Sequence, residues 1–145
     1  MRILFRTDSS NIIGSGHVIR CIKLAKELKS NGHSIFFVSR DHEGNLIELI
    51  KKHFEVFRLN CSNKYNSKKN DIYTKWLGEE TSRDMEQTIE IIKELKIDTL
   101  VVDHYGINFE WEYGIKKEVQ KLVVIDDIWT REHYCDGLIN HNYTE

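Results

Sequence analysis

Apolar residues along the chain follow two alternating patterns. Short, nearly continuous apolar runs, such as Ile3-Leu4-Phe5, are typical of strands that are covered on both faces of a sheet. Between these runs, apolar residues recur every three or four positions, which is the spacing of an amphipathic helix. The two patterns predict strands over residues 2–7, 34–39, 55–59, 98–102, 122–125 and 137–140, and helices over residues 16–30, 44–53, 81–96 and 108–119.

Two of the predicted helices carry clear apolar stripes. The helix over residues 16–30 ends at Asn31-Gly32, where glycine can take the left-handed conformation. The helix over residues 81–96 begins at Thr81 or Ser82, either of which can cap it. The expected buried positions are Val18, Cys21, Ile22, Ala25 and Leu28 in the first helix, and Met85, Thr88, Ile89, Ile92 and Leu95 in the second.

The order of these elements predicts the fold class. A β-α-β-α-β order is the signature of a parallel sheet with right-handed crossovers. We therefore expect one α/β domain over residues 1–145, a Rossmann-like parallel sheet with helices on both faces. Residues 60–75 interrupt the pattern with Asn, Ser and Lys, and a functional lid and plain disorder explain that segment equally well.

Composition narrows the classes of partner. The chain has 145 residues and a formal net charge of −2, which gives no electrostatic reason to expect nucleic acid or an acidic membrane. No apolar run approaches the ~20 residues that a bilayer span needs. The 3 cysteines are odd in number and far apart, which argues against a disulfide framework. The first residues lead directly into a strand rather than a signal peptide, so we expect a cytoplasmic location.

Residues 6–20 form the most informative stretch, because a polar loop with two glycines joins a strand to a helix there. Gly14 and Gly16 let a backbone approach a ligand, and the first N–H groups of a helix can receive an anion. His17 would lie at the positive end of that helix, which favours a neutral, proton-accepting imidazole. The alternative is a glycine-rich turn whose histidine only caps or packs. The loop lacks the Gly-Lys-Ser/Thr of a Walker A motif, and Ile19 stands where a dinucleotide fingerprint has its third glycine.

Polar residues also follow the carboxyl ends of three predicted strands, where ligands bind in open parallel sheets. Asp8 follows the first strand, residues 103–105 follow the fourth, and residues 126–127 follow the fifth. Each has a structural alternative. These are a turn cap for Asp103, a hydrogen-bonded rim position for His104, packing at the sheet edge for Tyr105, and a loop start without chemistry for at least one of Asp126 and Asp127. Asp and His recur here, but no metal-binding spacing supports a metal site, and we expect none.

Three motifs in order carry a family resemblance. They are Phe5-Arg6-Thr7-Asp8 with Gly14-Ser15-Gly16-His17-Val18-Ile19-Arg20, then Val102-Asp103-His104-Tyr105-Gly106, then Ile125-Asp126-Asp127. Along essentially the whole chain the sequence resembles the UDP-2,4-diacetamido-2,4,6-trideoxy-β-L-altropyranose hydrolase family of pseudaminic acid biosynthesis and its spore-coat polysaccharide relatives. The resemblance implies the N-terminal half of a GT-B architecture, without the C-terminal domain that holds most of the UDP. Residues 138–143 would then lie where the chain crosses to that domain.

The resemblance also implies a chemistry. A UDP-sugar is hydrolysed without metal or cofactor, with inversion at the anomeric carbon, and the isolated domain is expected to be weak or inactive without its C-terminal partner. The family's catalytic histidine falls on His17 and its active-site tyrosine on Tyr105. Neutral His17 would take a proton from water and Tyr105 would orient the water or a sugar substituent. The expected substrate-binding residues are Asp8, Gly14, Ser15, Gly16, Arg20, Asp103, His104 and Asp127.

Three other functions stay open at this point. A GT-B glycosyltransferase would use a sugar or lipid acceptor in place of water. A binding or assembly module would not depend on His17 at all. A general nucleotide-binding domain would need an acidic ribose contact, for which Asp41 is the candidate.

Overall fold

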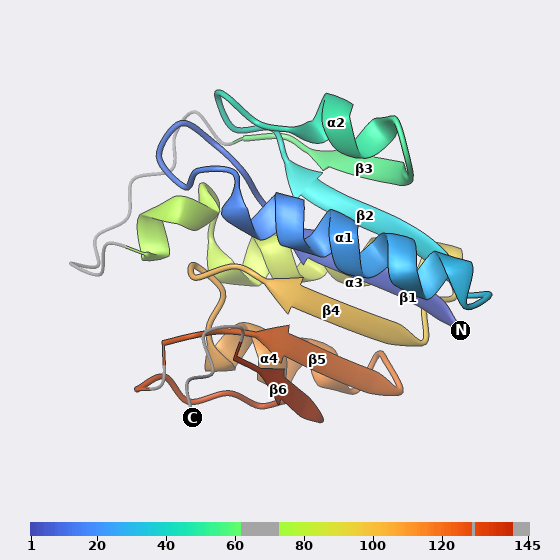
Figure 1. Cartoon of the computed structure of the whole chain (residues 1–145). Helices are drawn as coiled ribbons and strands as arrows, with labels where there is room; N and C mark the ends of the chain where they lie inside the picture. Colours follow the sequence, from blue (N-terminus) through green and yellow to red (C-terminus); the bar gives the residue numbers. More distant parts are fainter. Residues whose placement is uncertain (62–72, 129, 141–145) are drawn as a thin grey trace.

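The computed structural model describes residues 1–61, 73–128 and 130–140. It holds one parallel sheet with strand order β3-β2-β1-β4-β5-β6 (Figure 1). The strands are β1 (Arg2–Thr7), β2 (Ser34–Arg40), β3 (Glu55–Leu59), β4 (Thr99–Asp103), β5 (Lys121–Ile125) and β6 (Gly137–Ile139). The helices are α1 (Gly16–Ser30), α2 (Ile47–Lys51), α3 (Thr81–Leu95) and α4 (Phe109–Lys116), with a short 3-10 helix, η1 (Thr74–Leu77). The predicted Rossmann-like fold class is confirmed.

Helices cover the sheet on both sides (Figure 1). The side chains of α1 pack with Phe5, Phe37 and Ile50 in one apolar cluster. Those of α3 and α4 pack with Leu4, Leu100 and other residues in a second cluster on the opposite face. Buried strands between two helical layers are the reason that the apolar runs of β1 and β4 are continuous rather than alternating.

Two predicted helices are shorter in the structure. The segment predicted as a helix over residues 44–53 is helical only from Ile47 to Lys51, because Gly44 has φ +79° and the Asn45 side chain accepts a hydrogen bond from the backbone N–H of Ile47 at 2.9 Å. Such a side-chain bond competes with helix formation. The predicted helix over residues 108–119 ends at Lys116. Asn108 caps its start by accepting from the N–H of Trp111.

The predicted buried stripe of α1 is confirmed, with Val18, Cys21, Ile22 and Ala25 buried and Leu28 packed against the same cluster. The stripe of α3 is rotated from the prediction: Asp84 and Ile91 are buried together with Thr88 and Ile92. Met85, Ile89 and Leu95 are partly buried against the same core. The rotation places Asp84 against two buried cations, Arg6 and Arg40.

Residues 62–72 of the predicted loop lie outside the described residues, as do residues 141–143 of the predicted crossover. The end of the predicted loop is ordered as the start of η1, which the apolar pattern does not indicate. In the described part of the chain, no helix has both the length and the apolar character needed to cross a bilayer.

The register of the central strands sets the site. β1 pairs with both β2 and β4, and Thr7 lies opposite Asp103 where β1 and β4 end. The strand order reverses between β1 and β4, which is the place where ligands bind in sheets of this type. The loop that follows β1 and the loop that follows β4 therefore meet above this edge.

Candidate functional site

His17 is held by a carboxylate from the neighbouring strand. It is the second residue of α1, and its Nδ1 lies 2.5 Å from Oδ1 of Asp103, the last residue of β4. Arg20, one turn along α1, binds both oxygens of Asp103 through Nε and Nη2. Asp103 is fully buried. Burial alone would raise its carboxyl pKa, but the hydrogen bonds from Arg20 and His17 hold that pKa below its usual range, so Asp103 is anionic.

This arrangement selects one tautomer of His17. An anionic oxygen at 2.5 Å requires a proton on Nδ1, which leaves the lone pair of the neutral ring on Nε2. Nη2 of Arg20 lies 2.8 Å from the same Nδ1 and can only donate, so this contact favours the opposite tautomer. We assign the proton to Nδ1 because the anionic oxygen of Asp103 is the closer neighbour, and because Nη2 of Arg20 can donate to Asp103 instead. The sequence placed Asp103 in the substrate-binding set, and the structure shows it holding His17 and Arg20.

Tyr105 lies beside this group. Its ring meets the ring of His17 edge-on, with 4.6 Å between centroids, and its hydroxyl donates to Asp127. Burial and the bond to Asp127 raise the pKa of Tyr105 to about 12, so the phenol keeps its proton at neutral pH. The structure thus brings together five predicted residues from α1, from the end of β4 and from the loops that follow β4 and β5: His17, Arg20, Asp103, Tyr105 and Asp127.

The 3-10 helix η1 forms the wall behind Tyr105. Trp76 stacks on Tyr105 with 5.9 Å between ring centroids, and Tyr73 meets Tyr105 at 5.2 Å. Gly106 permits this approach, because a Cβ at that position would lie 2.7 Å from the carbonyl oxygen of Tyr73 and 3.0 Å from the nitrogen of Leu77. The periodicity of the sequence gave no sign of this wall.

The glycine loop supplies backbone rather than side chains. Gly14 has φ +83°, a conformation that favours glycine, and its N–H donates to the carbonyl of Ser10 at 2.9 Å. Ser15 precedes α1 and makes no side-chain cap bond. A Cβ on Gly14 or Gly16 would meet no atom within 4 Å, so this backbone is open to a ligand. The predicted roles of Gly14, Ser15 and Gly16 as substrate contacts stay predictions.

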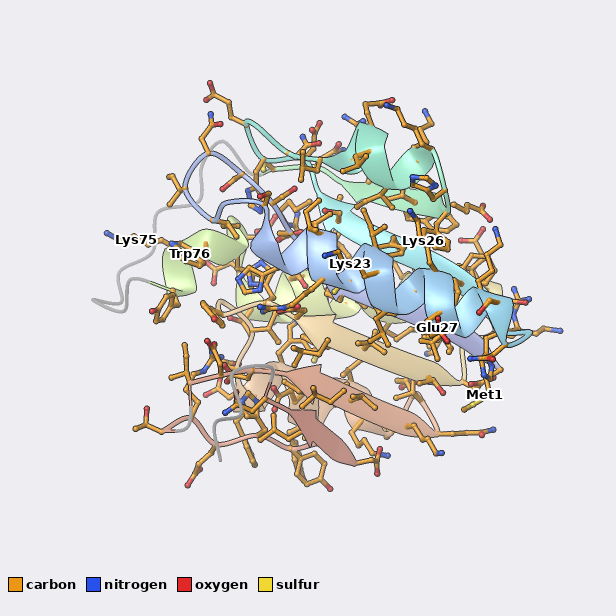
Figure 2. All side chains as sticks on the ribbon, in the orientation of Figure 1. Met1, Lys23, Lys26, Glu27, Lys75 and Trp76 are labelled. Carbon is orange, nitrogen blue, oxygen red and sulfur yellow. The ribbon has the colours of Figure 1, made fainter. Side chains whose placement is uncertain are left out.

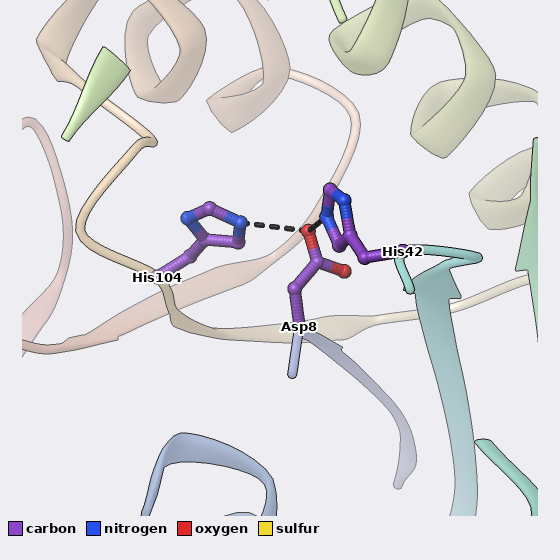
Figure 3. A group of neighbouring side chains, drawn as sticks. All are labelled: Asp8, His42 and His104. Atoms are coloured by element: carbon purple, nitrogen blue, oxygen red, sulfur yellow. Dashed lines mark hydrogen bonds and ion pairs between the residues drawn. The ribbon is translucent and has the colours of Figure 1, made fainter. Parts of the chain in front are cut away.

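Asp8, His42 and His104 point toward one another (Figure 3). Oδ2 of Asp8 is 2.7 Å from Nε2 of His104 and 3.1 Å from Nε2 of His42, and the carboxylate also binds Arg6. Asp8 is 1% exposed and His104 is 6% exposed. Burial would raise the pKa of Asp8, but the Arg6 charge and the histidine bonds hold it well below its usual range. Asp8 is therefore an anionic centre beneath the site, and the rim position considered for His104 is wrong.

Asp8, His42 and His104 have the composition of a metal-binding group. The hydrogen bonds of His104 argue against metal binding, because its Nδ1 accepts from the N–H of Gly106 at 2.9 Å. The neutral ring then carries its proton on Nε2, the atom that a metal would need, and donates it to Asp8. Burial, moreover, lowers the pKa of His104, which favours this neutral donor form. The geometry fits a hydrogen-bonded support better than a metal centre.

A buried charge network extends behind Asp8. Asp84 of α3 accepts from Nη2 of Arg6 at 2.6 Å, from Nη2 of Arg40 at 2.8 Å and from the indole N–H of Trp111 at 2.9 Å. All four side chains are fully buried. Sequence reasoning missed this network, and the one available signal was the polar residue Asp84 beside the apolar stripe of a strongly periodic helix. The network fixes α3 and α4 against the strands that carry the site.

Asp126 belongs to a separate cluster. It accepts from the backbone N–H of Ile128 at 3.0 Å, as a loop-starting aspartate does, and lies 2.5 Å from Nε2 of His133. Nδ1 of His133 is 2.7 Å from buried Glu112. These hydrogen bonds raise the pKa of His133 to about 9. The two neighbouring aspartates therefore have different partners. Asp127 accepts the hydrogen bond of the Tyr105 hydroxyl, whereas Asp126 connects the β5–β6 loop to α4 through His133.

Asp41, the residue that a ribose contact would need, binds Arg58 at 3.1 Å and accepts from Asn45 at 2.8 Å. Its carboxylate is thus engaged on the side of α2 and β3. This geometry gives no support to the general nucleotide-binding alternative.

The chain has relatives in both sequence and structure. It is 32% identical over 142 residues to the UDP-2,4-diacetamido-2,4,6-trideoxy-β-L-altropyranose hydrolase of Campylobacter jejuni, a match that covers 98% of this chain and 42% of the relative. It is 28% identical to the uncharacterized protein MJ1062 of Methanocaldococcus jannaschii, over 97% of this chain and 25% of that protein. No protein-family model matches. The resemblance drawn from the motifs is confirmed. The chain spans less than half the length of these curated relatives.

Among solved structures, the fold matches MurG of Acinetobacter baumannii. The TM-score is 0.57, with 11% sequence identity, over 87% of this chain and 34% of that protein. This likeness confirms the expected GT-B type of Rossmann-like fold.

Proposed function

We propose that this chain, which matches the Campylobacter hydrolase over 98% of its own length and 42% of the relative's, is the catalytic-base domain of a nucleotide-sugar hydrolase. The substrate would be a UDP-diacetamido-trideoxyhexose of pseudaminic acid or related surface polysaccharide biosynthesis. The products would be UDP and the free sugar. The observation that carries the proposal is the His17–Asp103–Arg20 group at the β1/β4 edge.

The reaction needs a base that removes a proton from the attacking water. Neutral His17 accepts a proton on Nε2 as the water oxygen attacks the anomeric carbon, and the bond from that carbon to the UDP oxygen breaks. Attack on the face opposite UDP inverts the anomeric centre. Asp103 holds the ring and stabilises the imidazolium that forms, because the anion and the cation attract each other. Arg20 keeps Asp103 anionic and in place.

The other residues position the substrate. Tyr105, whose hydroxyl is anchored on Asp127, offers its phenol oxygen to the attacking water or to a sugar hydroxyl. The open backbone of the glycine loop and the first N–H groups of α1 can face the diphosphate. Most contacts to UDP would come from a further domain, of the kind that the remaining length of the relative provides, so this chain alone would turn over slowly. No metal is part of this proposal, in which backbone N–H groups would meet the charge of the leaving UDP.

The test measures UDP release from the UDP-diacetamido-trideoxyaltrose substrate by this chain, with and without the C-terminal part of the Campylobacter hydrolase supplied in trans. His17→Ala is the test variant, and His53→Ala, which removes an exposed histidine, is its matched control. We expect release only with both parts, loss in His17→Ala and retention in His53→Ala. If both parts form a complex that binds UDP and still releases none, the proposal fails and a glycosyltransferase, which would use the same base on an acceptor hydroxyl, explains the site better.

A further inference from the structure

A cavity of about 430 Å³ lies beside the catalytic group, and the proposed reaction has not assigned it a role. This volume is in the range of small-molecule sites. Its walls are the loop after β1, the loop after β2 and η1. The lining residues are Ser10, Asn11, Ile12, Ile13, His42, Glu43, Lys75 and Trp76. Figure 2 shows Trp76 near the N-terminal end of α1, with the side chain of Lys75 extending outward from η1.

The walls of this cavity are fixed by hydrogen bonds and close packing. The N–H of Asn11 donates to the carbonyl of Glu43 at 3.0 Å, which ties the first two loops together. Gly44, at φ +79°, lets the loops touch, because a Cβ there would lie 2.1 Å from the side-chain oxygen of Asn11. Gly78 does the same for η1 and His42, since its Cβ would lie 2.7 Å from Cε1 of the His42 ring. A cavity between braced loops is preformed for a ligand.

The cavity is linked to the proposed base through two aromatic rings. Trp76 lines it and stacks on Tyr105, and Tyr105 meets His17. A substituent of a sugar ring whose anomeric carbon lies at His17 would reach past Tyr105 to the indole of Trp76. The cavity is therefore placed for a part of the sugar that does not react.

The lining combines an apolar wall with polar ends. Ile12, Ile13 and Trp76 are apolar, and Ile12 is 79% exposed, which leaves a large aliphatic side chain for a ligand to cover. Glu43 can accept a hydrogen bond from an amide N–H, and Lys75 can donate to a carbonyl. A methyl group joined to an amide is the chemistry that suits this combination.

We propose that this cavity binds one acetamido group of the hexose and so determines which UDP-sugars are accepted. The inference rests on the proposed function, and it assigns Trp76 and Ile13 as specificity-determining residues. Trp76 and Ile13 would contact the acetamido methyl, with Glu43 and Lys75 at the amide. A sugar with a hydroxyl in place of this acetamido would leave the apolar wall without a partner.

The test uses the free sugar, so that binding is separated from hydrolysis. 2,4-Diacetamido-2,4,6-trideoxyaltrose and two analogues, each with one acetamido replaced by hydroxyl, are titrated into this chain and followed by NMR. We expect one analogue to bind about tenfold more weakly than the diacetamido sugar, the size of effect that one apolar group has in a fitted pocket. The diacetamido sugar should shift the methyl signals of Ile12 and Ile13 and the indole signal of Trp76.

Two variants test the residues independently. Trp76→Ala and Ile13→Ala should each remove the difference between the sugars, and Ile13→Ala does so without touching the Tyr105 stack. Tyr113→Ala, which removes an aromatic ring 63% exposed on α4, is the control and should keep the difference. Equal binding of all three sugars, or a difference that survives in both variants, overturns the inference.

The result is distinguishable from that of the proposed function. Selective sugar binding without His17-dependent UDP release would retain the acetamido site and reject the hydrolase. His17-dependent release with no selectivity at Trp76 and Ile13 would retain the hydrolase and reject the site.

Discussion

Replacing Asp103 with Asn should switch the tautomer of His17 without changing the shape of the site. In the native protein Nδ1 of His17 lies 2.5 Å from Oδ1 of Asp103, to which we assign it as donor, while Nη2 of Arg20 lies 2.8 Å from the same nitrogen. An Asn side chain is neutral, and its oxygen is drawn to the two Arg20 donors. Its NH₂ group, or Nη2 of Arg20, then donates to Nδ1, which must become the acceptor. The proton moves to Nε2, and the ring can no longer accept a proton there.

The expected fall in kcat follows from the contribution of general base catalysis. General base catalysis contributes about 10²–10⁴-fold, so we expect kcat for UDP release to fall by that factor, which is about 3–5 kcal/mol of barrier. Tyr105 and the glycine loop are unchanged, and KM should move little. Raising the pH will not restore activity, because the defect is the position of the proton and not the charge of the ring.

Two measurements check this prediction. Imidazole ¹⁵N NMR of this chain should show the proton of neutral His17 on Nδ1 in the native protein and on Nε2 in Asp103→Asn. Glu86→Gln, which neutralises an exposed carboxylate on α3, should change neither the tautomer nor UDP release. A variant that keeps the Nδ1–H signal and full kcat would refute the assignment of Asp103 as the residue that positions the base.

Three further predictions concern stability. Asp84→Asn leaves two buried arginines with one fewer anion and should cost about 3–5 kcal/mol of unfolding free energy in urea denaturation, against less than about 0.5 kcal/mol for Glu86→Gln; a loss below about 1 kcal/mol would show that the buried network contributes little. His133 has a folded-state pKa of about 9, above its unfolded value, so its stabilisation is complete below about pH 6.5 and is lost as the pH rises to about 9. With solvent screening we expect on the order of 1–2 kcal/mol over this window, and the alkaline loss should be absent in His133→Gln. Gly106→Ala forces η1 away from its position and should cost about 1–3 kcal/mol in thermal or urea unfolding, with a change in indole fluorescence from Trp76; an unchanged Tm and spectrum would mean that the close approach is relaxed at no cost.

Local pattern predicted much of the fold. β1, α1 and β3 have the predicted bounds. A strand covered on both faces has a continuous apolar run, and an amphipathic helix has apolar residues every three or four positions, so both can be recognised from the sequence. Helix α2 is shorter than the local apolar pattern predicted. Gly44 and Asn45 form tertiary and side-chain contacts at the start of the segment, and these decide where the helix begins.

The candidate site was predicted as a set of residues and not as a set of contacts. His17, Arg20, Asp103, Tyr105 and Asp127 do lie together, because parallel strands present their carboxyl ends at one edge. Their individual roles in catalysis and substrate binding stay predictions. Asp8 and His104 share that edge but face inward, since Arg6 makes the interior a favourable place for the Asp8 carboxylate.

The sequence by itself determined the order of strands and helices, the parallel sheet and the edge at which polar residues gather, because these depend on short-range periodicity and chain direction. Only the tertiary structure decided which side chains contact one another. His17 and Asp103 are 86 residues apart, and the β1–β4 register brings them within hydrogen-bond distance. Asp84 and Arg6 are 78 residues apart, and a charged residue in a sequence gives no sign of the opposite charge that allows it to be buried. Pairing between distant residues is a property of packing, and packing is absent from any local pattern.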